Sequence, residues 1–175
     1  MMDGERQVVV FRKDLLPISE TFISTQMASY QRWAPVLVGY RRVAGLDIDG
    51  IPHRTLFDGQ RVDNRIRMKL DQYGSLAGRQ SKRLDQMLAK IKPDLVHAHF
   101  GYDAILAAPS VARAGLPMVV TLHGTDILRD WSAWASGDMG FFFRFYPRTI
   151  RRLFADPRIH FLAVSEALRI QAIER

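Results

Sequence analysis

Three short motifs place histidine, acidic and glycine residues where apolar runs of the chain end. They are Ser19-Glu20-Thr21, His99-Phe100-Gly101 and His123-Gly124-Thr125-Asp126. In open parallel sheets, ligands bind at the carboxyl ends of the strands, where loops and helix N-termini converge. A glycine at such a point, as Gly124 would be, lets the backbone approach a ligand closely. We therefore expect these motifs to form one ligand-binding rim.

A pair of histidines lies just before the second motif. His97 and His99 are two residues apart on a predicted strand, so their side chains share one face. This spacing could hold a metal ion, but the sequence shows no third ligand. Strands of a parallel sheet are usually buried on both faces. We therefore expect a structural role for His97, a place near the cleft for His99, and no metal site.

The first motif also fits a simpler role. Serine is favoured as a helix N-cap, and an acidic residue beside it meets the positive end of the helix dipole. We expect Ser19 to cap a helix that runs to about residue 32. Capping and ligand binding remain alternatives for Glu20. For His123, a hydrogen bond to a neighbouring loop is the alternative to a ligand contact.

The elements that would position these motifs follow from hydrophobic periodicity. Short apolar, β-branched runs alternate with segments of helical period, which is typical of βαβ units and a parallel sheet. The predicted strands are 7–12, 35–40, 53–57, 95–100, 118–123 and 159–164. The predicted helices are 19–32, 61–92 with a break near 74–78, 103–114, 126–136, 141–155 and 165–175. The fold class is α/β, a Rossmann-like open parallel sheet with helices on both faces.

Several segments in this order resemble glycosyltransferase family four, whose enzymes have the GT-B fold. They are Pro93-Asp94-Leu95-Val96-His97-Ala98-His99-Phe100-Gly101, residues 115–126 (GLPMVVTLHGTD) and Val164-Ser165-Glu166-Ala167-Leu168. The early Pro17-Ile18-Ser19-Glu20-Thr21-Phe22-Ile23 is similar to the subgroup that builds colanic acid and other exopolysaccharides. The resemblance spans nearly the whole chain but only the first half of the family's architecture. It implies the N-terminal, acceptor-side half of a GT-B fold.

The resemblance also implies an activity. The complete enzyme would move a hexose from a nucleoside-diphosphate sugar to a glycan or polyprenyl-linked acceptor, with retention at the anomeric carbon and without a metal or other cofactor. The chain ends within a predicted helix, and its 175 residues leave no room for the C-terminal nucleotide-sugar-binding domain. We expect residues 1–175 to be a single domain of a longer enzyme, inactive alone, with the donor held by the missing domain.

Site residues are assigned through the same resemblance. His123 would be the catalytic residue that faces the transferred sugar. The expected acceptor- and sugar-binding residues are Ser19, Glu20, Thr21, His99, Gly101, Gly124 and Asp126. Some relatives carry a glycine pair where this chain has Leu16-Pro17-Ile18, so direct contact of this loop with the donor phosphates is not expected.

Composition limits the partners and the compartment. The chain is 47% hydrophobic, carries a formal charge of +7 and has no cysteine. Its apolar start, residues 8–11, is shorter than the roughly 7–15 residues of a secretory signal, and no run reaches the ~18 apolar residues of a membrane span. We expect a cytoplasmic protein with an acidic partner or an anionic surface to meet its charge.

The positive charge is concentrated in residues 61–92 and 141–158. In the second segment, helical spacing predicts a core face of Phe142, Tyr146, Ile150 and Leu153 and a basic stripe of Arg144, Arg148, Arg151 and Arg152. A basic amphipathic helix can lie on anionic lipid, and a solvated face is the alternative. We favour peripheral contact with the inner membrane. Trp131 and Trp134 could stack on a sugar ring but are more often packing residues.

Two other functions are compatible with the pattern. Nucleotide-sugar epimerases and phosphorylases reuse the same two-domain fold. A basic Rossmann-like module could instead bind nucleic acid. The basic residues lie on predicted helices without interleaved aromatic stacking positions or a known reading motif, which argues against that class.

Overall fold

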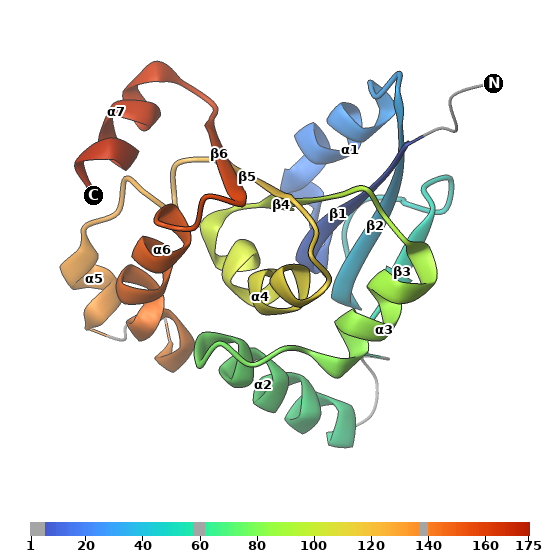
Figure 1. Cartoon of the computed structure of the whole chain (residues 1–175), viewed down its shortest axis with the longest axis horizontal. Helices are drawn as coiled ribbons and strands as arrows, with labels where there is room; N and C mark the ends of the chain where they lie inside the picture. Colours follow the sequence, from blue (N-terminus) through green and yellow to red (C-terminus); the bar gives the residue numbers. More distant parts are fainter. Residues whose placement is uncertain (1–5, 58–61, 137–139) are drawn as a thin grey trace.

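The computed structural model describes residues 6–57, 62–136 and 140–175 as a sheet of six parallel strands with helices around it (Figure 1). The strands are β1 (Arg6–Leu15), β2 (Trp33–Arg42), β3 (His53–Thr55), β4 (Leu95–His99), β5 (Met118–Leu122) and β6 (Ile159–Ala163). Their order across the sheet is β3-β2-β1-β4-β5-β6. The predicted Rossmann-like parallel sheet is confirmed, and it is consistent with the N-terminal half of a GT-B fold.

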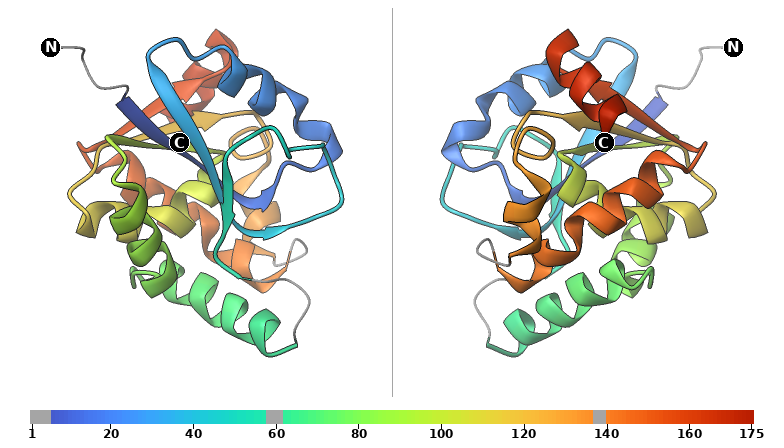
Figure 2. Two further views of the ribbon diagram at one scale, coloured as in Figure 1. Left: turned by 90° about the vertical axis from the view of Figure 1, so that its right-hand side faces the viewer. Right: turned by 90° about the vertical axis from the view of Figure 1, so that its left-hand side faces the viewer.

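Helices lie on both sides of this sheet (Figures 1 and 2). They are η1 (Ile18–Glu20), α1 (Thr21–Ala28), α2 (Val62–Leu76), α3 (Lys82–Ile91), α4 (Gly101–Arg113), α5 (Trp131–Ala135), η2 (Phe141–Phe145), α6 (Tyr146–Phe154) and α7 (Glu166–Glu174), where η marks a 3₁₀ helix. α4 packs on β1, β4 and β5, and α2, α3 and α6 pack around α4. α1 covers β1 and β2 from the opposite side.

Alternation along β1 explains why helices are needed on both faces. Val8 and Val10 pack with α1 on one side, whereas Val9 and Phe11 pack with α3 and α4 on the other. All four side chains are nearly inaccessible to solvent. Residues of opposite parity in a strand point to opposite faces, so a strand that is apolar throughout requires cover on both sides.

The first loop differs from the prediction. β1 continues to Leu15, beyond the predicted end at residue 12, because Asp14 and Leu15 still pair with the end of β2. Ser19 does not cap α1: it is an exposed residue of η1, and the N-cap position belongs to Glu20, whose side chain caps nothing. The Glu20 carboxylate is instead drawn into the interior by Arg12.

The helix predicted over 126–136 is shorter than expected. Residues 125–128 form a turn, and α5 begins only at Trp131, capped by the Asp130 carboxylate. Asp126 does not start a helix: its carboxylate binds the N–H of Gly101 at the start of α4 and the N–H of His123 in its own loop. The break predicted near 74–78 is confirmed: α2 ends at Leu76, and Ser81 caps α3.

Within the described residues, no helix combines the length and apolar character needed to cross a membrane.

Candidate functional site

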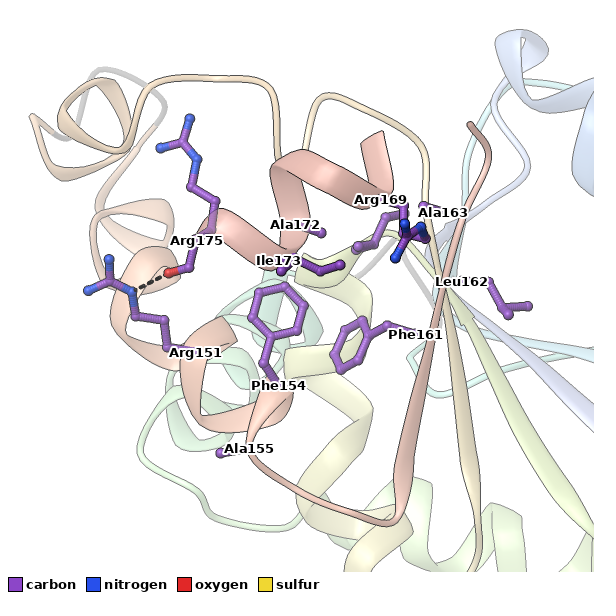
Figure 3. A pocket seen from close by; sticks show the side chains of 11 residues that line it. Arg151, Phe154, Ala155, Phe161, Leu162, Ala163, Arg169, Ala172, Ile173 and Arg175 are labelled. Carbon is purple, nitrogen blue, oxygen red and sulfur yellow. Dashed lines mark hydrogen bonds between the residues drawn. The ribbon is translucent and has the colours of Figure 1, made fainter. Parts of the chain in front are cut away.

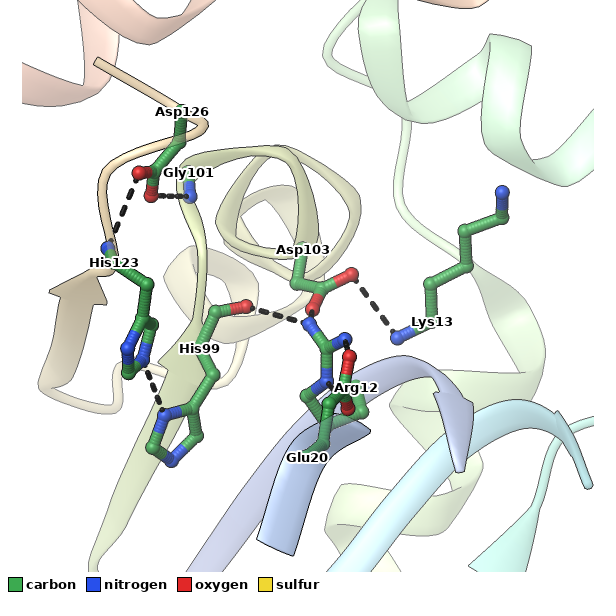
Figure 4. A network of polar contacts seen from close by, with 8 residues as sticks. All are labelled: Arg12, Lys13, Glu20, His99, Gly101, Asp103, His123 and Asp126. Carbon is green, nitrogen blue, oxygen red and sulfur yellow. Dashed lines mark hydrogen bonds and ion pairs between the residues drawn. The ribbon is translucent and has the colours of Figure 1, made fainter. Parts of the chain in front are cut away.

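The sheet order changes direction between β1 and β4, and this switch point lies beside the predicted motifs. The chain runs outward from β1 to β3, then crosses back so that β4 pairs with β1. Connections leave the sheet in opposite directions at such a point, which opens a crevice at the carboxyl ends of the two strands. Glu20, His99 and His123 all lie at this end, as expected (Figure 4).

His123 follows β5 and is held on three sides. Its Nε2 lies 3.0 Å from Nδ1 of His99, which is fully buried. The rings of Phe22 and Phe100 each approach the His123 ring with 4.6 Å between centroids. These contacts fix the orientation of the imidazole while leaving it partly exposed. The arrangement suits a side chain that must present one nitrogen to a ligand.

Phe100 adopts an unusual backbone conformation where β4 becomes α4. Its φ is 71° and its ψ is 144°, a region that costs a non-glycine residue about 1–3 kcal/mol. The conformation places its ring against His123 and under the guanidinium of Arg12, 4.6 Å from the ring centroid. Such strain persists only where surrounding contacts hold it, and it concentrates at functional sites.

Arg12 lies behind the rim and joins three segments. Its guanidinium pairs with the carboxylates of Glu20 and Asp103 and donates to the carbonyl oxygen of His99, at 3.0 Å. Lys13 N–H donates to the second oxygen of Asp103 at 3.0 Å. All three charged side chains are buried, so Arg12 links β1, η1 and α4 directly under the rim.

One cation shared by two carboxylates leaves negative charge in the interior. Burial raises the pKa of Asp103 to about 7, although Arg12 acts in the opposite direction. Burial also raises the pKa of Glu20, again against the effect of Arg12. Burial by itself would lower the pKa of Arg12, but the two carboxylates raise it above its ordinary value. Arg12 therefore stays charged, and the carboxylates of Glu20 and Asp103 are both bound to its guanidinium.

Asp126 ties the loop after β5 to the start of α4. One carboxylate oxygen accepts the backbone N–H groups of His123 and Gly124, at 3.1 and 2.9 Å. The other oxygen accepts the N–H of Gly101, at 3.0 Å. Asp126 is 1% exposed, and burial raises its pKa despite these three bonds. Its buried carboxylate thus fixes the backbone of both rim segments, the one at Gly101 and the one at residues 123–124.

A sequence model of Glycosyltransferase Family 4 matches residues 41–175, most of the chain. The chain belongs to this family. The match includes His99 and His123 but begins after Arg12 and Glu20. A search of curated proteins found no match. The chain is therefore a domain of a glycosyltransferase, a class that binds a nucleotide-sugar donor and an acceptor.

The predicted site residues of this family 4 domain differ in their exposure to solvent. Ser19 and Thr21 are exposed beside the rim, and Gly101 and Gly124 are buried in its backbone. Gly124 has a φ of 114°, which favours glycine. A Cβ on Gly101 would lie 2.2 Å from the Tyr146 hydroxyl, so only glycine fits there without movement.

His97 has a structural position in the family 4 domain, as expected. It is 5% exposed, and its ring nitrogens lie 3.1 Å from the Tyr30 hydroxyl and 2.8 Å from Thr121 Oγ1. It also shares a face with His99, at 4.4 Å between ring centroids. Both of its nitrogens are thus occupied by protein groups.

Sequence reasoning assigned no role in the site to four of its contributors, Arg12, Phe22, Phe100 and Asp103, although Phe100 belongs to one of the three motifs. Arg12 directly follows the apolar run 8–11, on a strand predicted to be buried, which was a signal that it needs buried partners, because such groups are almost never buried unpaired. Phe22 belongs to the segment that resembles the exopolysaccharide subgroup, and it is 40% exposed at the rim. Nothing in the local pattern indicated its contact with His123.

The predicted basic stripe of the family 4 domain divides at α6. Arg148 and Arg152 line a groove of about 440 Å³ with Phe141 and Phe145 of η2. Arg151 lies over the Trp131 ring, 4.6 Å from its centroid, and donates to the carbonyl oxygen of Arg175. Arg151 therefore does not line the groove with Arg148 and Arg152 but contacts Trp131 and Arg175 instead.

Packing roles are confirmed for most of the residues expected to have them. Tyr146 and Ile150 are buried with Trp134, and Leu153 packs against them. The Phe142 side chain, also expected in this core, lies outside the described residues. Trp131 is half-buried, and the guanidinium groups of Arg151 and Arg175 lie over its ring, 4.6 and 5.4 Å from the centroid.

A separate cavity of about 620 Å³ lies between β6, α6 and α7 (Figure 3). Phe154 and Phe161 form its apolar floor, and Arg151, Arg169 and Arg175 lie around it. Arg169 is paired with Glu166. The histidines of the rim do not line this cavity.

Proposed function

We propose that the chain is the acceptor-side domain of a retaining hexosyltransferase that works in cell-surface polysaccharide synthesis. The donor is a nucleoside-diphosphate hexose, held by a second domain outside this sequence. The acceptor is a glycan or a polyprenyl-linked sugar that binds at the rim formed by residues 19–21, 99–101 and 123–126. His123 contacts the transferred sugar, and no metal takes part.

The observation that carries this proposal is the placement of His123. In a family 4 chain, a histidine held between two aromatic rings follows β5 and contacts His99 at the end of β4, beside the switch point where ligands of such folds bind. Binding at this rim would orient a sugar against a donor held across a cleft, and orientation supplies much of the rate in transfer between two bound substrates. The exopolysaccharide pathway rests on the resemblance of residues 17–23.

The test is a transferase assay with labelled nucleoside-diphosphate hexoses and glycan or polyprenyl-phosphate-linked acceptors. The 175-residue chain alone should give no turnover, and a protein that joins it to a nucleotide-binding domain should transfer hexose with retention. In that protein, His123→Ala should lower kcat/KM by roughly 10²-fold or more. His160→Ala, at an exposed histidine on β6, is the matched control and should have little effect.

Three results would count against the proposal. Turnover by the chain alone would remove the need for a second domain. An epimerised or phosphorolysed sugar product would assign the protein to the other enzymes of this fold. Full activity of His123→Ala would place the sugar elsewhere.

We also propose that the domain contacts an anionic membrane surface through α2, η2 and α6. Ile66, Leu70 and Tyr73 recur at helical spacing on α2 and are 57%, 66% and 38% exposed. Phe141 and Phe145 continue this apolar surface, with Tyr73 and Phe141 rings 5.9 Å apart. Large exposed apolar side chains in one patch are typical of interaction surfaces.

Basic side chains surround this apolar surface, which favours lipid headgroups as its partner. Arg65 and Lys69 lie on the exposed part of α2, and Arg144, Arg148 and Arg152 on η2 and α6. Apolar groups that enter the headgroup region, flanked by cations, are the pattern of peripheral membrane proteins. A polyprenyl-linked acceptor would be reached from such a surface.

Cosedimentation with phosphatidylglycerol vesicles tests this contact. Binding at low salt should weaken at high salt, because exposed charges are screened. Leu70→Glu and Arg152→Glu should each reduce partitioning at least about fivefold. Arg54→Glu makes the same charge change on β3, away from the patch, and should have less effect. Absence of binding at low salt, or equal effects of Arg152→Glu and Arg54→Glu, would reject the surface.

A further inference from the structure

Three imidazoles, those of His97, His99 and His123, lie in a row that ends at the rim. The rings of His97 and His99 are 4.4 Å apart between centroids, and those of His99 and His123 are 5.3 Å apart. Only the second pair is joined by a hydrogen bond, from ring to ring, between His99 Nδ1 and His123 Nε2. A neutral imidazole carries its hydrogen on one nitrogen, so one of these rings donates and the other accepts.

The remaining nitrogen of His99 decides the direction of this bond. His99 is 0% exposed, and its Nε2 has no hydrogen-bond partner among the described residues. A hydrogen on Nε2 would be a buried donor without an acceptor, and such a donor loses its hydrogen bonds to water without replacement. Unpaired buried N–H groups are rarer in proteins than incompletely paired acceptors. The hydrogen therefore belongs on Nδ1, and His99 donates to His123.

Both rings remain neutral in this arrangement near pH 7. Burial lowers the pKa of His99 to about 2, with His97, His123 and Arg12 acting in the same direction. Burial lowers the pKa of His123 to about 4, and the charge of Arg12 adds to this effect. A neutral pair joined by one hydrogen bond has two possible tautomer assignments, and the unpaired Nε2 of His99 selects one.

We propose that His99 is a positioning residue that holds His123 in its Nδ1–H tautomer, so that His123 presents a hydrogen-bond donor to the ligand. The tautomer of a histidine follows from the hydrogen bond that its other nitrogen makes. His123 Nε2 accepts from His99, so its hydrogen lies on Nδ1. Rotation of the ring would break the bond to His99 and is opposed by Phe22 and Phe100.

The tautomer specifies what His123 can do. An Nδ1–H group donates to an oxygen with a free lone pair, and it does not accept the proton of a hydroxyl. If the site binds sugar, an inference that rests on the proposed function, His123 holds a hexose oxygen and leaves deprotonation of the acceptor to another group. His123 would then orient the sugar rather than act as a general base.

Nitrogen-15 NMR of the histidine-labelled chain at pH 7 tests the tautomer directly. Long-range ¹H–¹⁵N correlations distinguish a protonated from an unprotonated ring nitrogen, and His123→Gln assigns the signals. We expect Nδ1 of both His99 and His123 to be protonated and Nε2 of both to be unprotonated. Protonated Nε2 on His123 in the unchanged chain would overturn the proposal, whatever any variant does.

A variant tests the dependence on His99. His99→Phe keeps an aromatic ring but removes the donor, so His123 should move toward the Nε2–H form that neutral histidines favour in water. The His97 signals report whether β4 still folds. A folded His99→Phe chain in which His123 stays purely Nδ1–H would show that another group sets the tautomer. None of these measurements requires sugar, so failure of the transferase assay and failure of this inference are separate results.

Discussion

The Asp126 carboxylate should contribute more to the stability of the rim than any single surface charge. Two substitutions, to alanine and to asparagine, remove its hydrogen bonds to different extents. In Asp126→Ala, three buried N–H groups lose their acceptor. Each buried donor left without a partner costs about 1–3 kcal/mol, and relief of a buried charge offsets part of the sum. We expect the free energy of unfolding to fall by about 3–5 kcal/mol.

Asp126→Asn separates the two oxygens. The amide oxygen can still accept from His123 and Gly124, but the amide N–H₂ faces the N–H of Gly101, so one bond is lost and one donor is unpaired. We expect a loss of about 1–3 kcal/mol, smaller than that of the alanine variant. Asp130→Ala, which removes an exposed helix cap in the same loop, is the control and should cost the least.

Urea unfolding followed by circular dichroism and tryptophan fluorescence measures these differences, provided the slope against urea is unchanged. Amide hydrogen exchange adds a local measurement. Protection of Gly101 should fall in both Asp126 variants, whereas His123 and Gly124 should lose protection only in the alanine variant. Two results would contradict this role of the carboxylate in binding the three amides. One is an equal loss of unfolding free energy in Asp126→Ala and Asp126→Asn. The other is a loss in Asp126→Ala that is no larger than the loss in Asp130→Ala.

Two further predictions concern packing and pH. Gly101→Ala should lower the free energy of unfolding by about 1–3 kcal/mol, because its Cβ would overlap the Tyr146 hydroxyl. In a double-mutant cycle, Tyr146→Phe should remove most of that cost. If the costs of the two substitutions simply add, this overlap is not the cause. Burial lowers the pKa of His97 and His123 to about 4 and that of His99 to about 2, so the stability that these histidines contribute is complete above pH 6.5 and is lost as pH falls. Asp103, whose pKa burial raises to about 7, acts in the opposite sense. Three protons gained by the unfolded chain against one by the folded chain predict a loss of about 2 kcal/mol per pH unit between pH 6.5 and 5, measured by urea unfolding at each pH, and a constant or rising stability would refute this balance.

Local sequence patterns were sufficient for the strands and for most of the helices. The β-branched runs predicted six strands, and the glycines of residues 74–78 indicated the break between α2 and α3. Glycine and histidine residues at strand ends indicated the rim. These features are local because the periods of strand and helix, and the conformations of glycine and proline, depend on near neighbours in the chain.

Tertiary structure decided which side chains meet at that rim. Arg12 and Asp103 are 91 residues apart in the chain, and His99 and His123 are 24 apart; they come together because β1, β4 and β5 are adjacent and end at the same level. A pattern along the chain shows which face a residue occupies but not which residue lies opposite it. Strand order and register determine that, which is why Glu20 was assigned to a ligand or a helix cap by its sequence and to Arg12 by the fold.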